Sequence, residues 1–266
     1  MIKALLTHNI KSNYKIFLIF LAVMTMYSSI IIGMYDPDDA AAIEAMMDLM
    51  PEALMNAMNF TIISGDLIGF IGGYYYGFII VLFPMIFTII LSFKLMGKII
   101  DDGSIAFILS TPHTRKSMII TQISTLILNI FTLLFATTII GMLLTEIMFA
   151  GLLDIQVYIL LNVGAFLLFF AIGSITFFCS TVFNEAKNAI GLSIAVPVGF
   201  FIIDMLASVS EDIAFLRFFS IFTLYDNIAI VTGEAWIWLQ FLALLAIGIF
   251  LFIGSTIVFL KKDLTI

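Results

Sequence analysis

Residues 155–182 read IQVYILLNVGAFLLFFAIGSITFFCSTV, a run without a single charged side chain. About 20 consecutive apolar residues suffice for a helix to cross the hydrocarbon core of a bilayer. Strands of membrane barrels alternate polar and apolar residues, whereas the segment 157–161 (VYILL) does not. The stretch therefore predicts a transmembrane α-helix.

Five further apolar stretches flank this one, so the chain is predicted to be an all-α polytopic membrane protein with six transmembrane helices. Of its 266 residues, 63% are hydrophobic and 11% are charged, and the mean hydropathy is +1.22. A chain of this composition cannot fold in water, which excludes a soluble enzyme. The expected spans are 15–35, 67–97, 118–145, 155–182, 188–209 and 236–260.

The basic residues orient these spans, because Lys and Arg in short loops stay preferentially on the cytoplasmic side. With a cytoplasmic N-terminus, ten of the eleven Lys and Arg residues fall at inner ends, and only Arg217 lies outside. Lys3 marks one inner flank, and Lys261 and Lys262 mark another. We therefore expect both termini in the cytoplasm.

The acidic residues have the opposite distribution, with fourteen of the eighteen Asp and Glu residues outside or at the outer boundary. Such a surface could attract cations or basic peptides. Simple solvation of the outer loops is the favoured interpretation, because acidic residues are not needed to orient the spans.

Residues 1–14 precede the first span and are amphipathic. Ile2, Leu5, Leu6 and Ile10 fall roughly on one face of a helix. This pattern predicts an interfacial helix on the inner leaflet, with a frayed cytoplasmic tail as the alternative.

The outer segment 36–66 is long and has helical signals of its own. Asp38 or Asp39 can cap a first helix, and Pro51 can restart a second one. A helical pair packed on the outer rim is the favoured interpretation, although thioethers can bind copper(I) and flexible Met-rich surfaces suit varied ligands. The methionines are Met46, Met47, Met50, Met55 and Met58.

Small residues recur at four-residue spacing in the second span, at Gly69, Gly73 and Gly77. Such a ridge lets another helix approach closely. It predicts a packing surface, either between two subunits or inside one bundle.

The inner loop 101–117 carries helix-ending and helix-starting signals. Gly103 can end the second span in the left-handed conformation, Ser104 can cap a short helix, and Thr111-Pro112 can cap and open the third span. The short helix would need lipid or a protein partner to cover its apolar face. That face is made by Ile105, Ile108 and Leu109.

Motifs of several enzyme classes do not occur in the chain. It contains no G-x-x-x-x-G-K-[ST], no H-E-x-x-H and no G-x-S-x-G sequence. With His8 and His113 as its only histidines, a metal site has few ligands to draw on. We therefore expect no catalytic, cofactor or metal site in this chain.

Ionisable residues are scarce inside the expected spans, where coupling groups of ion-driven carriers usually lie. Lys94 is close to the inner edge and Asp204 is close to the outer edge. Gln122, Asn129 and Asn162 lie deeper, and such residues more often join helices than carry ions. A transporter of this kind must receive its energy from elsewhere.

The whole chain resembles an ABC-2 type ABC transporter permease. The most specific part is the inner loop 102–115 (DGSIAFILSTPHTR), with an acidic-Gly start, a short apolar helix and a Thr-Pro-x-x-Arg exit. The second inner loop 183–189 (FNEAKNA) and the ending 259–264 (FLKKDL) are similar to the family as well.

The resemblance implies one transmembrane permease domain over 1–266, in the plasma membrane of a prokaryote. In the family the first inner loop forms a coupling helix that docks on a separate ATPase subunit. The residues expected to contact that subunit here are Gly103, Ser104, Ile105, Phe107, Ile108, Leu109, Pro112 and Arg115.

The resemblance also implies the partners. Two ATPase subunits would bind ATP and Mg, a second permease copy or a paralogue would complete the path, and membrane lipid, not nucleic acid, would surround it. Relatives export antibiotics, bacteriocins or other amphipathic compounds, although sodium, polysaccharide and copper-maturation systems share the fold. A secondary carrier or channel and a non-transporting membrane sensor are the alternatives.

Overall fold

The computed structural model describes residues 1–37, 51–58, 60, 64–101, 103–105, 112–183, 186–209 and 211–262. This part of the chain is helical and contains no strand. Its α-helices are α1 (Lys3–Met34), α3 (Glu52–Ala57), α4 (Leu67–Tyr74), α5 (Ile80–Ser92), α6 (Lys98–Asp101), α8 (Arg115–Met148), α9 (Ile155–Val182), α10 (Ala186–Val209), α11 (Asn227–Thr232) and α12 (Ile237–Lys261).

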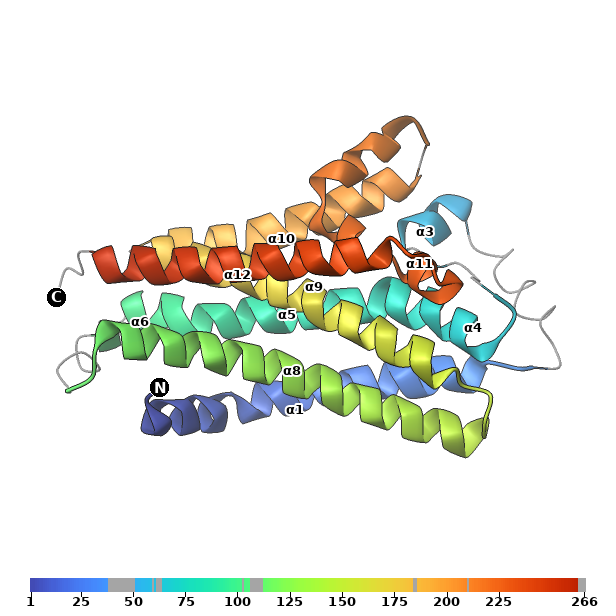
Figure 1. Ribbon diagram of the computed structural model, residues 1–266, viewed down its shortest axis with the longest axis horizontal. Helices are drawn as coiled ribbons and strands as arrows, with labels where there is room; N and C mark the ends of the chain where they lie inside the picture. Colours follow the sequence, from blue (N-terminus) through green and yellow to red (C-terminus); the bar gives the residue numbers. More distant parts are fainter. Residues whose placement is uncertain are drawn as a thin grey trace.

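Six helical stretches in the described residues are long and apolar enough to cross a membrane, which confirms the predicted fold class. The second of them joins α4, α5 and α6 through two π-helical segments, Tyr75–Ile79 and Phe93–Gly97. The six stretches lie alongside one another in an elongated bundle (Figure 1). They are Lys3–Met34, Leu67–Ile100, Arg115–Met148, Ile155–Val182, Lys187–Val209 and Ile237–Lys261.

A further apolar segment between α10 and α12 is bent by 80°. It consists of two 3₁₀ helices, Glu211–Phe219 and Ile221–Leu224, followed by α11. Both chain ends lie at the same end of the bundle (Figure 1), which requires an even number of crossings. The bent segment therefore returns to the side from which it starts and is not a seventh span.

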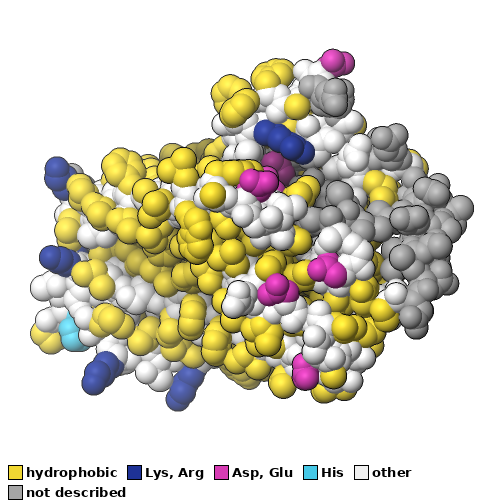
Figure 2. Space-filling model, turned by 45° about the vertical axis from the view of Figure 1, so that its right-hand side comes forward, with side chains coloured by type: hydrophobic (Ala, Val, Ile, Leu, Met, Phe, Trp, Pro, Cys, Tyr) yellow, Lys and Arg dark blue, Asp and Glu magenta, His cyan; other side chains and the backbone are white. Residues whose placement is uncertain are grey.

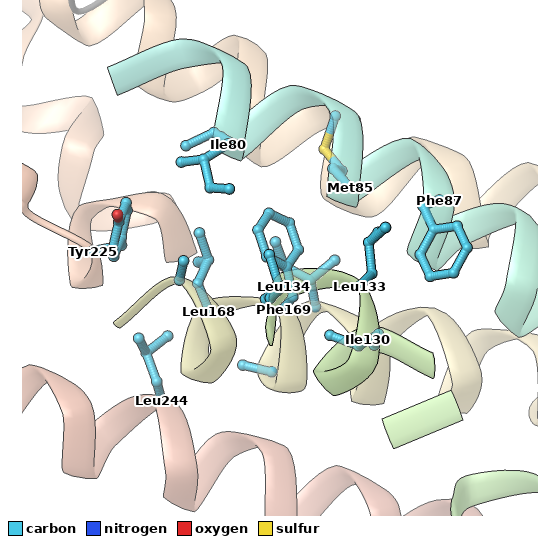
Figure 3. Close-up of a cluster of buried hydrophobic side chains, with 14 of the residues drawn as sticks. Ile80, Met85, Phe87, Ile130, Leu133, Leu134, Leu168, Phe169, Tyr225 and Leu244 are labelled. Carbon is cyan, nitrogen blue, oxygen red and sulfur yellow. The ribbon is translucent and has the colours of Figure 1, made fainter. Parts of the chain in front are cut away.

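Helix α9 is the centre of the bundle, because it contacts α5, α8, α10 and α12. Its buried Leu168 and Phe169 meet side chains of α5, α8 and α12 in one apolar cluster (Figure 3). Lipid chains are as apolar as these side chains, so close van der Waals packing, not escape from water, holds such helices together.

Glycines permit close approach at positions other than the predicted ridge. A Cβ on Gly173 of α9 would lie 3.1 Å from Ile130 of α8 and 3.4 Å from Thr88 of α5. In the second span, a Cβ on Gly69 would instead meet Ser64, which precedes α4 in the chain. Glycines of three helices thus allow close approach in the described residues, because a Cβ on Gly141 of α8 would meet Tyr158 and a Cβ on Gly248 of α12 would meet Phe170, both of α9.

The predicted ridge is not one regular α-helical surface. Gly69 and Gly73 are buried inside the chain and Gly77 is half-buried. Gly77 belongs to the π-helical segment Tyr75–Ile79, whose wider turns change the register after Gly73. A role of these glycines between two subunits stays a prediction.

The segment 1–14 is helical as predicted, but it is not a separate element, because α1 runs without a break from Lys3 to Met34. The Asn9 side chain is buried, and its amide donates to the Gln122 Oε1 atom of α8 at 2.7 Å. The Ile2 backbone N–H donates to the Thr121 hydroxyl at 2.8 Å. These polar contacts hold the segment against α8, and its position on the inner leaflet stays a prediction.

The second helix expected in the segment 36–66 is present as α3, which begins directly after Pro51. Asp38 and Asp39, with Met46, Met47 and Met50, lie outside the described residues. Metal or ligand binding by this segment stays a prediction.

Charges of opposite sign separate along the bundle. On the face shown in Figure 2, most Lys and Arg side chains lie at one end and the Asp and Glu side chains lie in the other half, with a continuous apolar surface between them. We call the end that holds both chain termini the basic end, and the opposite end, where α3 and α11 lie, the acidic end (Figure 1).

Candidate functional site at the basic end

Three segments that are distant in the sequence meet at the basic end. The Arg115 guanidinium, at the start of α8, donates from Nη1 to the Lys262 carbonyl at 2.9 Å. The Lys262 ammonium donates to the Thr181 and Phe183 carbonyls, each at 2.7 Å. The exit of the first inner loop, the end of α9 and the end of α12 are thus joined through one residue.

Lys262 stabilises the end of α9. The last carbonyls of a helix have no partner within the helix, and a cation there also interacts favourably with the helix dipole. Burial lowers the pKa of Lys262 to about 8, so the ammonium form still predominates at neutral pH. The sequence does not predict this role for Lys262, because Lys261 and Lys262 are both basic residues at the inner end of the sixth span and nothing distinguishes them.

The first inner loop begins as the sequence predicts. Gly103 has a φ of +69° and ends α6, which confirms the left-handed helix end. Ser104 and Ile105 are helical. The predicted contact residues Phe107, Ile108 and Leu109 lie outside the described residues, so their exposure and their role as a docking face stay predictions.

Ile105 does not lie on the exposed apolar face where it was expected. Its side chain is only 3% exposed and belongs to the core cluster of buried residues. The turn at Gly103 directs the chain back toward the bundle, so Ile105 contacts the core of this chain. The expected exposure of Ile105 is therefore wrong, and a contact of this residue with an ATPase stays a prediction.

The cap of the third span is Thr114, not the expected Thr111-Pro112 pair. The Thr114 hydroxyl accepts a hydrogen bond from the Ser117 N–H at 3.2 Å, and α8 begins at Arg115. Pro112 is exposed and precedes the helix. The exposed stretch 112–114 and half-buried Arg115 leave this exit of the loop accessible at the basic end.

Gln122, Asn129 and Asn162 are the polar residues inside the spans that are expected to join helices, and two of the three do so. Gln122 accepts from Asn9 of α1, and the Asn162 amide donates to the Tyr76 hydroxyl of the second span at 2.5 Å. Asn129 bonds instead to the Thr125 carbonyl of its own helix at 2.8 Å. No group of three or more metal-ligating side chains occurs within the described ranges.

The acidic end contains a packed segment that the sequence analysis does not predict, between the expected spans 188–209 and 236–260. The Asn227 amide of α11 donates to the Gly72 carbonyl at 2.7 Å, and the Tyr225 hydroxyl donates to the Leu161 carbonyl at 3.3 Å. The apolar residues between Ile213 and Ile230 were the available signal for this packed segment.

A family model described as "ABC-2 family transporter protein" matches residues 10–264 of the chain. The match includes the second to sixth spans and most of the first, together with all three segments that meet at the basic end. No curated protein and no solved structure matches the chain.

Proposed function

This chain belongs to the ABC-2 family of transporter proteins, and from that membership we propose that it is the membrane-spanning permease subunit of an ATP-driven exporter. Two separate ATPase subunits would bind ATP and Mg and supply the energy. ABC-2 permeases are the membrane components of such systems and not the catalytic ones. Six apolar helices and a plasma-membrane location agree with this role.

The observation that carries the proposal is the connected basic end. Arg115, Lys262 and Phe183 link the exit of the first inner loop to two central helices by hydrogen bonds of 2.7–2.9 Å. A force applied to this loop by a partner would therefore reach α8, α9 and α12 directly. Such a link is what coupling by an external ATPase requires.

A second permease, identical or a paralogue, would complete the translocation path in this proposal. The spans α1 and α10 are the least covered by the rest of the chain, so their apolar faces are free for lipid or for the second subunit. Substrate would pass along the interface between the two permeases. We propose an amphipathic compound, an antibiotic or a peptide as the substrate.

We propose that the basic end is cytoplasmic, because ten of the eleven Lys and Arg residues are assigned to it. Single cysteines replacing the exposed residues His113 and Ala235, in a Cys179→Ala background, should then react from opposite sides of intact cells. A membrane-impermeant maleimide is expected to label the second site alone. Labelling of His113→Cys without permeabilisation would contradict this orientation.

The docking role of the first inner loop is tested by the double variant Ile108→Asp, Leu109→Asp. Apolar anchors at an interface commonly cost more than about 1 kcal/mol each when lost, so ATPase retention should fall by more than about tenfold. The measurement is co-purification of a P-loop ATPase with the tagged permease from its native membrane.

His113→Asp is the matched control, because it adds a carboxylate to the same loop at an exposed position outside the apolar face. It is expected to retain the ATPase. Undiminished retention by the double variant, with normal membrane insertion, would contradict docking through this face.

A further inference from the structure

A pocket of about 90 Å³ opens at the acidic end, between the second span, α10 and the bent segment. The end of α3 also lines it, through Ala57 and Met58, so four segments that are separated in sequence supply its walls and it forms only in the folded chain. The lining residues that matter for its chemistry are Tyr76, Phe201, Asp204, Arg217, Phe222 and Asp226.

Aromatic rings form much of the wall. The Phe201 ring lies 6.1 Å from the Phe78 ring and 5.7 Å from the Phe222 ring, measured between centroids. Tyr76 and Tyr225 line the same pocket. Faces of aromatic rings attract cations, and more strongly where water is partly excluded.

The charged groups of the pocket differ in how they are bonded. The Asp226 carboxylate accepts from the Ala229 N–H at 2.9 Å and so caps α11. Arg217 donates to the Ser208 hydroxyl at 3.1 Å. The half-buried Asp204 carboxylate faces the Arg217 guanidinium electrostatically, but the two form no hydrogen bond within the part of the chain that the structure describes.

An ionised carboxylate removed from water is costly unless it gains a partner. Two carboxylates against one guanidinium leave the pocket with a net charge of −1, from −2 + 1. A bound cation would compensate the negative charge that Arg217 leaves over. A compact head group fits the volume, which exceeds the space that one water molecule needs.

We propose that this pocket binds the ammonium or guanidinium head group of a cationic amphiphile, with the Asp204 carboxylate as the ionic partner and the aromatic rings around it. The proposal rests on the proposed export function, because it specifies the substrate class. Metal binding fits less well, since calcium takes six to eight oxygen ligands and no three metal-ligating side chains cluster in the described ranges.

The test measures equilibrium binding to the full-length chain in phosphatidylcholine nanodiscs, without ATP, ATPase or an ion gradient. The probe is decyltrimethylammonium, with neutral decyl maltoside and anionic decyl sulfate as comparisons and empty nanodiscs as the blank. Wild-type protein should bind the cation above the blank and bind the other two probes no more than the blank does. Equal binding of all three probes would overturn the proposal.

Asp204→Asn keeps the shape of the side chain and removes its charge, and should weaken decyltrimethylammonium binding by about tenfold or more. Glu234→Gln is the matched control, because it removes the same charge at an exposed site of the acidic end and should bind as wild type. Unchanged binding by Asp204→Asn, or equal loss in both variants, would overturn the proposal.

Arg217→Gln is a second variant, for which stronger and not weaker binding of the probe is expected. It keeps the proposal testable if Asp204→Asn does not fold. Removal of the single cationic side chain of the pocket should strengthen binding of the probe several-fold. Weaker or unchanged binding would overturn the proposal. Because no ATPase is present, these results are independent of the co-purification experiment, and either proposal can fail without the other.

Discussion

Transport by the reconstituted permease and its partner ATPase is expected to stop when ATP is withdrawn and to continue when ion gradients are collapsed. Ion-coupled carriers need ionisable or cation-coordinating groups near the bilayer midplane. Within the expected spans the charged residues are Lys15, at the first position of the first span, Lys94 and Asp204. The Lys94 ammonium donates to the Asn13 side chain at 3.5 Å, and Asp204 lines the pocket at the acidic end.

The measurement uses proteoliposomes with ATP on the side of the ATPase. Ionophores that collapse proton and sodium gradients should leave the rate within about twofold, whereas ATP removal should abolish transport. Substitution of the ATPase P-loop lysine is the control, since it preserves assembly and prevents ATP use. Transport that persists without ATP while a gradient stands would favour a secondary carrier over the proposed exporter.

Gly173→Leu is expected to prevent stable folding of the chain. A Cβ at this position already lies 3.1 Å from the Ile130 side chain and 3.4 Å from Thr88, and a Cδ methyl of Leu126 is 3.6 Å away. Overpacking of a core commonly costs about 1–3 kcal/mol, and here a whole isobutyl group must enter between α9, α8 and α5. The variant should unfold at lower temperature and elute as aggregate from size-exclusion chromatography in detergent.

Gly191→Leu is the matched control, because no atom lies within 4 Å of a Cβ placed on that glycine of α10. Leu favours a helix over Gly, so the control should be at least as stable as wild type. Equal thermal stability of the two variants would contradict the close packing of α9 that the structure shows.

The family, the helical class and the six spans could all be predicted from the amino-acid sequence. Residues 155–182 were predicted as a span and form α9 over the same residues. In lipid every backbone N–H and C=O must find a partner within the segment, so an apolar run of sufficient length has only one structure available. Local composition therefore decides where helices occur, and the match to the ABC-2 family over residues 10–264 confirms the resemblance.

Local helix-end chemistry was predictable for similar reasons. Gly103 adopts the left-handed conformation and Pro51 precedes a new helix, because both depend on the backbone of one or two residues. The prediction that Thr111-Pro112 caps the third span was wrong, because Thr114 lies only three residues further along and can cap the same helix. Composition alone does not decide among neighbouring residues that can each accept the same hydrogen bond.

The helix surfaces that pack together could not be predicted from the sequence and are known from the structure. Ile105 is buried, residues 3–14 form the first part of α1, and Gly173 of the central helix lies close to α8 and α5. Lys262 bonds to residues about 80 positions away in the sequence. In an apolar chain nearly every helix face has the same hydrophobicity. The periodicity of hydrophobic residues therefore does not indicate which face of a helix packs against the other helices. That outcome follows from the shapes and polar contacts of residues from distant segments, which exist only once the helices have assembled.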